Sequence, residues 1–119
     1  MRRHRLEATD AELYDQLVGY LAAEGAVDED RVQGLVVLTE FDHRPLPVPL
    51  RLHITATSFG DHLRAAAPDA AAAWPDVQPA EAAWRLFLVH LEEAVRTAKP
   101  GETELILDRT GVVSRAADA

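Results

Sequence analysis

The sequence predicts a single α+β domain in which a mainly antiparallel sheet of about four strands packs against helices. Two periodicities support this prediction. Apolar side chains alternate along some segments, as on a strand with one buried face, and recur every three or four residues along others, as on an amphipathic helix. The segments follow the order helix, strand, strand, helix, helix, strand, strand. Because strands come in adjacent pairs, hairpins and antiparallel pairing are expected.

The first helix is predicted to begin after Thr9 and to end near Gly25. Thr9 and Glu12 have the spacing of a capping box, in which each side chain binds a backbone N–H of the other residue. Leucine then recurs every fourth residue, at Leu13, Leu17 and Leu21. This pattern predicts one buried face, and glycine is the usual residue just past a helix end.

Residues 32–41 are rich in branched apolar residues and predict the first strand. Apolar side chains occupy both faces, with Leu35, Val37 and Phe41 on one and Val36 and Leu38 on the other. This two-sided pattern predicts a central strand.

Residues 45–57 predict the second strand, with apolar residues at every even position. Arg51, His53, Thr55 and Thr57 occupy odd positions and are expected to face away from the core. Prolines at positions 45, 47 and 49 lack N–H donors and should block one edge of the first half of this strand. Residues 51–57 contain no proline and can therefore pair with a second neighbouring strand.

Ser58 and Asp61 predict the cap of a short helix over residues 59–67, which Pro68 ends or interrupts. A longer helix is predicted from Pro79 to about residue 98, with ion pairs between Glu81 and Arg85 and between Glu92 and Arg96. Residues 103–108 and 112–114 predict a closing hairpin.

The chain has 119 residues, the size of one domain. We expect a flexible basic arm over residues 1–8, one α+β domain over 9–115, and a frayed end over 116–119. No apolar run approaches the roughly 20 residues of a membrane helix, so no membrane association is expected. The chain has no cysteine, which excludes disulfides and thiolate chemistry and predicts a cytoplasmic protein.

The net charge is −8 although the arm contains three arginines, so the body of the protein is acidic. An acidic body repels phosphate backbones, and no nucleic-acid partner is expected. The six glycines form no phosphate-binding loop, and neither serine lies in a Gly-x-Ser-x-Gly motif. We therefore predict no cofactor and assign no catalytic residue.

Two functions fit these observations. The favoured one is a small acidic protein-interaction module that is regulatory, chaperone-like or toxin-neutralising, is not an enzyme, and binds a second copy of itself or another protein. Its predicted surface consists of Arg51, His53, Thr55 and Thr57. The alternative is a small-ligand-binding or hydrolytic protein that uses His53 with a cluster of Asp42, His43, Asp61 and His62. Their spacing matches no standard metal-ligand motif, and no metal is assigned.

Overall fold

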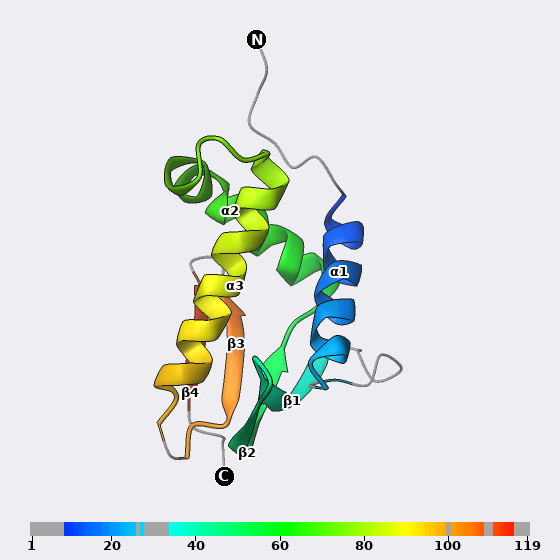
Figure 1. Cartoon of the computed structure of the whole chain (residues 1–119), viewed down its shortest axis with the longest axis vertical. Helices are drawn as coiled ribbons and strands as arrows, with labels where there is room; N and C mark the ends of the chain where they lie inside the picture. Colours follow the sequence, from blue (N-terminus) through cyan, green and yellow to red (C-terminus); the bar gives the residue numbers. More distant parts are fainter. Residues whose placement is uncertain (1–8, 26, 28–33, 100, 109–110, 116–119) are drawn as a thin grey trace.

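A computed structural model describes residues 9–25, 27, 34–99, 101–108 and 111–115, and these residues form three helices and one four-stranded sheet (Figure 1). The elements are α1 (Asp10–Ala23), β1 (Leu35–Phe41), β2 (Arg44–His53), α2 (Ala56–Ala73), α3 (Pro79–Thr97), β3 (Glu104–Asp108) and β4 (Gly111–Arg115). Their order confirms the predicted α+β fold. The predicted arm over residues 1–8 and the predicted frayed end over 116–119 lie outside the described residues.

The sheet has the strand order β1-β2-β3-β4 and is mixed. Both hairpins, β1–β2 and β3–β4, are antiparallel as predicted, whereas β2 and β3 run parallel. A parallel pair requires a long crossover connection, and α2 and α3 supply it.

The prediction that the first strand is central was wrong, because β1 stands at the end of the described strand order and β2 lies inside the sheet. Both faces of β1 are apolar, but only one is covered. Val36 and Leu38 are buried, whereas Leu35 and Val37 are 36% and 39% exposed. The two-sided apolar pattern reflects an uncovered apolar face and not a central position.

The prolines of β2 coincide with a break in its pairing. The register with β1 shifts between Leu38 and Glu40, so that residues 46–49 stand opposite a single residue, Thr39. Proline is tolerated at such bulges because it has no N–H to contribute to the ladder. As predicted, only the second half of β2 takes a second neighbour: β3 pairs with residues 51–53, and the Arg51 N–H donates to the Thr103 carbonyl at 2.8 Å.

The second strand ends at His53, earlier than the predicted Thr57, because Thr55 caps α2. The Thr55 side chain accepts from the Ser58 N–H at 3.1 Å, and the Ser58 hydroxyl accepts from the Thr55 N–H at 2.8 Å. The predicted Ser58–Asp61 cap was therefore wrong. Pro68 does not end the helix, whose buried face continues beyond it to Ala70.

The ends of α1 and the polar side of α3 agree with the predictions. Thr9 and Glu12 form the capping box, and Gly25 follows α1 with a φ of 77°. On α3, Glu81 pairs with Arg85 at 3.1 Å and Glu92 with Arg96 at 3.8 Å.

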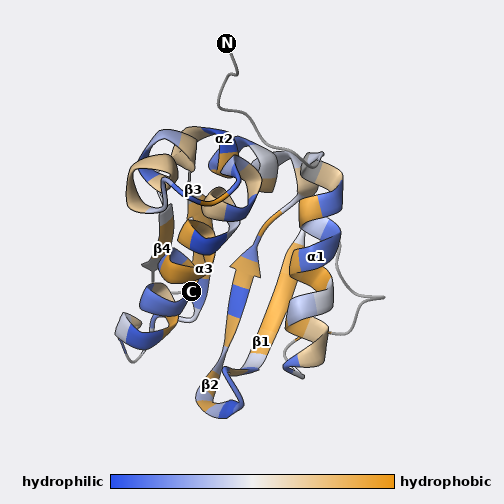
Figure 2. Cartoon of the chain, turned by 45° about the horizontal axis from the view of Figure 1, so that its top comes forward, coloured by the Kyte–Doolittle hydropathy of each residue, from blue (hydrophilic) through white to orange (hydrophobic). Residues whose placement is uncertain are grey.

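The core lies between the sheet and the helices. Figures 1 and 2 show the three helices on the same side of the sheet, and Figure 2 shows that the strands are largely hydrophobic. Fully buried side chains come from every layer: Leu17, Leu21, Val36, Leu38, Leu52, Ile54, Phe59, Leu63, Phe87, Leu91 and Leu105. The opposite face of the sheet has no helix against it among the described residues.

Candidate functional site

The strand register places two rows of side chains across the face of the sheet that points away from the helices. Leu35 pairs with His53, His53 with Ile106, and Ile106 with Val113. In the second row Val37 pairs with Arg51, and Arg51 with Glu104. We call these seven residues the outer face. Leu35, Val37 and Val113 are 36%, 39% and 48% exposed, so the outer face presents apolar side chains to solvent.

Charged side chains lie between these apolar residues. The His53 Nε2 atom contacts Glu104 Oε1, and the Arg51 Nη1 atom lies 3.5 Å from Glu104 Oε2. Glu104 is only 8% exposed although it belongs to the outer face. Arg51, His53 and Glu104 therefore form a small cluster, in which the largely buried Glu104 carboxylate lies between the exposed side chains of Arg51 and His53.

The environment of Glu104 favours its ionised form. The hydrogen bond from His53 is the main cause that lowers the pKa of Glu104, and it outweighs the opposing effect of burial. Electrostatic interactions with His53 and with the Arg51 guanidinium lower this pKa further. The cluster is consequently an ion-paired group on the sheet and presents both signs of charge within a few ångströms.

The structure divides the predicted interaction surface into two parts. Arg51 and His53 lie together on the outer face, as expected. Thr55 is instead the N-cap of α2, and Thr57 is an exposed residue in the first turn of that helix. Glu104, which holds the cluster together, was not among the predicted residues. The alternation of Glu104 with Leu105 in β3 could have placed Glu104 on the polar face of a strand. It could not have shown that Glu104 lies beside Arg51.

Two residues of the alternative cluster occupy the turn between β1 and β2. Asp42 and His43 have φ values of 55° and 63°, the left-handed conformation that a two-residue hairpin turn requires. The His43 N–H donates to Glu24 Oε1 at 3.1 Å, and the His43 Nδ1 atom lies 3.5 Å from the same oxygen. These contacts tie the turn to the end of α1.

The other two residues of that cluster lie on α2. Asp61 pairs with Arg64 at 2.6 Å, whereas His62 is 1% exposed and packs 5.5 Å from the Phe87 ring and 5.7 Å from the His90 ring. The structure thus places His43 in a turn, His53 on the outer face and His62 in the helical layer. Within the part of the chain that is described, no group of three or more His, Asp or Glu residues is arranged to hold a metal ion.

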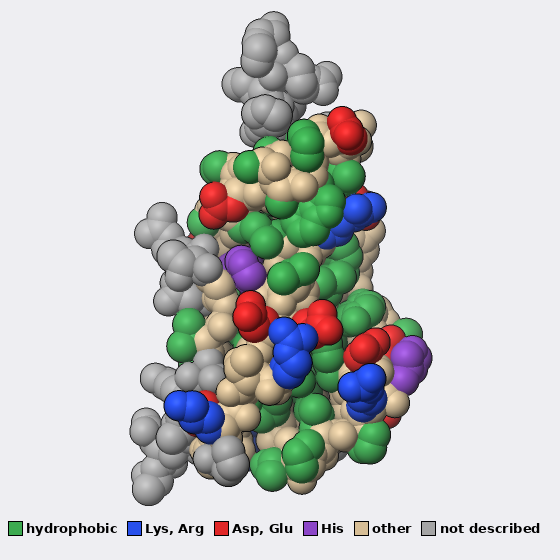
Figure 3. Space-filling model, turned by 60° about the vertical axis from the view of Figure 1, so that its left-hand side comes forward, with side chains coloured by type: hydrophobic (Ala, Val, Ile, Leu, Met, Phe, Trp, Pro, Cys, Tyr) green, Lys and Arg blue, Asp and Glu red, His purple; other side chains and the backbone are tan. Residues whose placement is uncertain are grey.

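Figure 3 shows the side of the molecule that lies on the left in Figure 1. Acidic and basic side chains form a belt across its middle, with apolar side chains above and below. Two ion pairs of this kind were predicted along α3, between Glu81 and Arg85 and between Glu92 and Arg96. Such exposed pairs along a helix contribute only about 0.3–0.5 kcal/mol each and do not by themselves mark a site.

Comparisons with known proteins add no assignment. The chain matches no protein-family model, and neither the curated proteins nor the solved structures contain a significant match. Of the helices described here, none has the length and apolar character needed to cross a membrane.

Proposed function

We propose that this protein is a small, non-enzymatic interaction module that binds another protein through its outer face. The supporting observation is that three exposed apolar side chains, Leu35, Val37 and Val113, surround an ion-paired cluster on a sheet face with no described helix against it. Exposed apolar patches with polar neighbours are typical of protein-binding surfaces. A regulatory, chaperone-like or toxin-neutralising protein of the cytoplasm would act through such a face, and the absence of cysteine supports that location.

A second copy of the chain is the partner that the outer face favours. A two-fold axis brings the same patch of two copies together, so the patch must be complementary to itself. The outer face meets this requirement because its exposed apolar side chains, Leu35, Val37 and Val113, can pack against the same side chains of the second copy. Arg51 already has its opposite charge, Glu104, within its own chain, so it enters the contact as part of an ion pair. The chain as a whole carries −8, so most other approaches of two copies are repulsive.

The size of the outer face predicts a weak dimer. Four strands spaced about 4.8 Å apart and five residues long at about 3.3 Å per residue cover about 300 Å². Stable complexes bury about 800 Å² on each partner. We therefore expect a dissociation constant of tens of micromolar, which corresponds to about −6 kcal/mol.

Sedimentation velocity tests the proposal over protein concentrations from about 5 to 300 μM, which bracket that dissociation constant. The wild type should change from monomer to dimer across this range. Val37→Asp replaces an exposed apolar side chain of the outer face with a carboxylate and should stay monomeric, because that charge would lose its contact with water at the interface. Val89→Asp is the matched control, because Val89 is 45% exposed on α3 and should leave association unchanged.

Two results contradict the proposal. A wild type that stays monomeric up to about 300 μM shows that the outer face does not join two copies at the affinity expected of this area. A dimer that Val89→Asp disrupts and Val37→Asp leaves intact places the contact on the helical side of the molecule.

A further inference from the structure

His53 lies in the longer of the two rows of the outer face. In the strand register it stands between Leu35 of β1 and Ile106 of β3. Its Nε2 atom contacts Glu104 Oε1, and its side chain is 43% exposed. The imidazole therefore has one side against a carboxylate and another side open to solvent, or to a partner that covers the outer face.

His53 is the residue of the outer face whose charge can change near neutral pH, because an imidazole ordinarily gains its proton between about pH 8 and about pH 5. Glu104 stays ionised over that range, since the hydrogen bond from His53 lowers the pKa of this carboxyl. The Arg51 guanidinium stays protonated. Mild acid therefore adds positive charge to the outer face at His53 and leaves the charges of Arg51 and Glu104 unchanged.

The other charged residues of these strands balance one another. β1 contributes only apolar residues to the two rows, whereas β2 contributes Arg51 and β3 contributes Glu104. The register adds Arg115 of β4, which pairs with Glu104, and Asp108 at the end of β3. These residues carry two positive and two negative charges. A proton on His53 therefore changes a balanced set of charges into a positive one.

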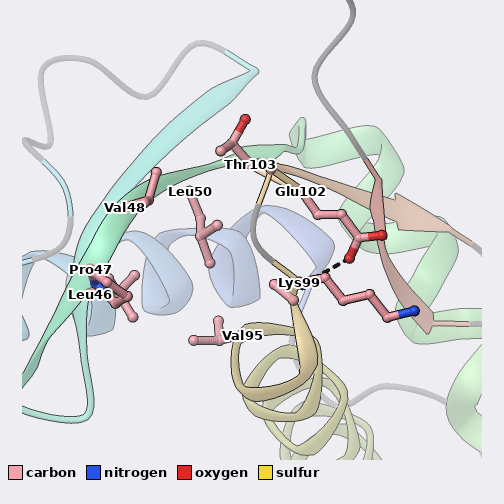
Figure 4. A pocket seen from close by; sticks show the side chains of 10 residues that line it. Leu46, Pro47, Val48, Leu50, Val95, Lys99, Glu102 and Thr103 are labelled. Atoms are coloured by element: carbon pink, nitrogen blue, oxygen red, sulfur yellow. Dashed lines mark hydrogen bonds between the residues drawn. The ribbon is translucent and has the colours of Figure 1, made fainter.

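Lys99 and Glu102 are charged residues on the helical side of the sheet. They line a hollow of about 270 Å³ between β2 and α3, whose walls include Leu50 and Val95 (Figure 4). The Glu102 carboxylate accepts from the Lys99 backbone N–H at 2.9 Å. Leu50 belongs to the core. The hollow thus lies on the side of the sheet opposite to His53, and its two charged residues are not part of the outer face.

A dimer formed through the outer face would cover the exposed part of His53. Removing an imidazolium from water costs more free energy than removing a neutral imidazole. The Glu104 carboxylate offsets only part of this cost, because it also pairs with Arg51. A two-fold axis brings one such charge from each copy to the same interface, where the two repel each other. Both effects oppose association in acid.

We propose that His53 makes association of the outer face sensitive to pH, so that two copies bind near neutral pH and separate as His53 gains a proton. This inference rests on the proposed dimer. We expect the dissociation constant to rise about tenfold between about pH 7.5 and about pH 5.8. Protonation of histidines elsewhere acts in the opposite direction, because it makes a chain of charge −8 less negative and less self-repelling. Weakening in acid therefore indicates a local effect at the outer face.

Sedimentation velocity at these two pH values, over about 5 to 300 μM protein, tests the inference. His53→Gln and His53→Lys have side chains of comparable reach, one neutral and one permanently charged. The Gln variant should associate equally at both pH values, whereas the Lys variant should associate weakly at both. His43→Gln is the matched control, because His43 is 79% exposed in the β1–β2 turn, and it should keep the pH dependence of the wild type.

Each contrary result has a distinct meaning. A wild-type dissociation constant that is equal at the two pH values, or smaller in acid, overturns the inference and leaves the proposed dimer standing. Equal association of His53→Lys and His53→Gln at the higher pH overturns it as well, because charge at this position would then have no effect. Loss of the pH dependence in His43→Gln with retention in His53→Gln assigns the effect to the turn. A wild type that is monomeric at both pH values overturns the proposed dimer, and the inference with it.

Discussion

Replacing Phe87 with alanine should remove the centre of the core. Phe87 is fully buried on α3, and its ring lies 4.9 Å from the Phe59 ring at an angle of 89°. The rings of His62 and Trp84 lie 5.5 Å and 6.0 Å away. The pairs with Phe59 and His62 are edge-to-face and the pair with Trp84 is stacked, and aromatic pairs in these geometries stabilise a core beyond the area that they bury. Phe87 therefore links α2 to α3 through several aromatic contacts.

The expected loss of stability follows from two terms. Returning the ring to water costs about 2 kcal/mol, as for any fully buried large apolar side chain. A residual cavity of about 100 Å³ adds about 2.4 kcal/mol at about 24 cal/mol per Å³. We expect Phe87→Ala to lower the free energy of unfolding by about 4 kcal/mol, a large fraction of the total stability of a domain of this size.

Urea unfolding followed by circular dichroism measures this loss. The control is Val89→Ala on the same helix, at a position that is 45% exposed, and it should change the free energy of unfolding by less than about 0.5 kcal/mol. A loss below about 1 kcal/mol in Phe87→Ala would refute the packing of Phe87 in the core, because replacing a fully buried phenylalanine with alanine lowers the free energy of unfolding by more than this.

Three further predictions concern single residues. Leu52→Ala should cost about 2–5 kcal/mol in urea unfolding, because Leu52 is fully buried in the middle of the sheet; a loss under about 1 kcal/mol would be inconsistent with that burial. Pro68→Ala should raise the free energy of unfolding by about 1–3 kcal/mol by restoring a helical hydrogen bond inside α2, and a loss of stability would speak against a continuous helix there. The pKa of Glu104 is lowered in the folded protein, so its ionised carboxylate stabilises the fold. This contribution to the free energy of unfolding is complete above the ordinary pKa of a glutamate and is lost as the pH falls through the lowered value. Glu104→Gln should therefore be less stable than the wild type at pH 7, and this difference should shrink below about pH 4.

Local features of the fold were predictable because each depends on neighbouring residues. The Thr9–Glu12 capping box needs only the two side chains and their spacing. The buried face of α3 follows from apolar residues three and four positions apart. The proline-blocked half of β2 follows from a missing N–H, wherever the neighbouring strand lies.

The remaining features depend on contacts between distant parts of the chain. Parallel pairing of β2 with β3 joins residues that are more than 50 positions apart, and nothing in their alternation identifies the neighbour. For the same reason Glu104 was not predicted as part of the interaction surface, because only the pairing of β2 with β3 places it beside Arg51 and His53. The extension of α2 past Pro68 depends on the packing of its buried face, which outweighs a local preference.

Dilution of ¹⁵N-labelled protein from about 500 to 20 μM tests whether the outer face joins two copies of the chain, since this range spans the expected dissociation constant. The amides of Val37, Arg51 and Glu104 should shift with concentration, while those of α3 should stay fixed. Fixed amides on the outer face throughout the dilution, or shifts confined to α3, would show that the outer face is not the contact between two copies.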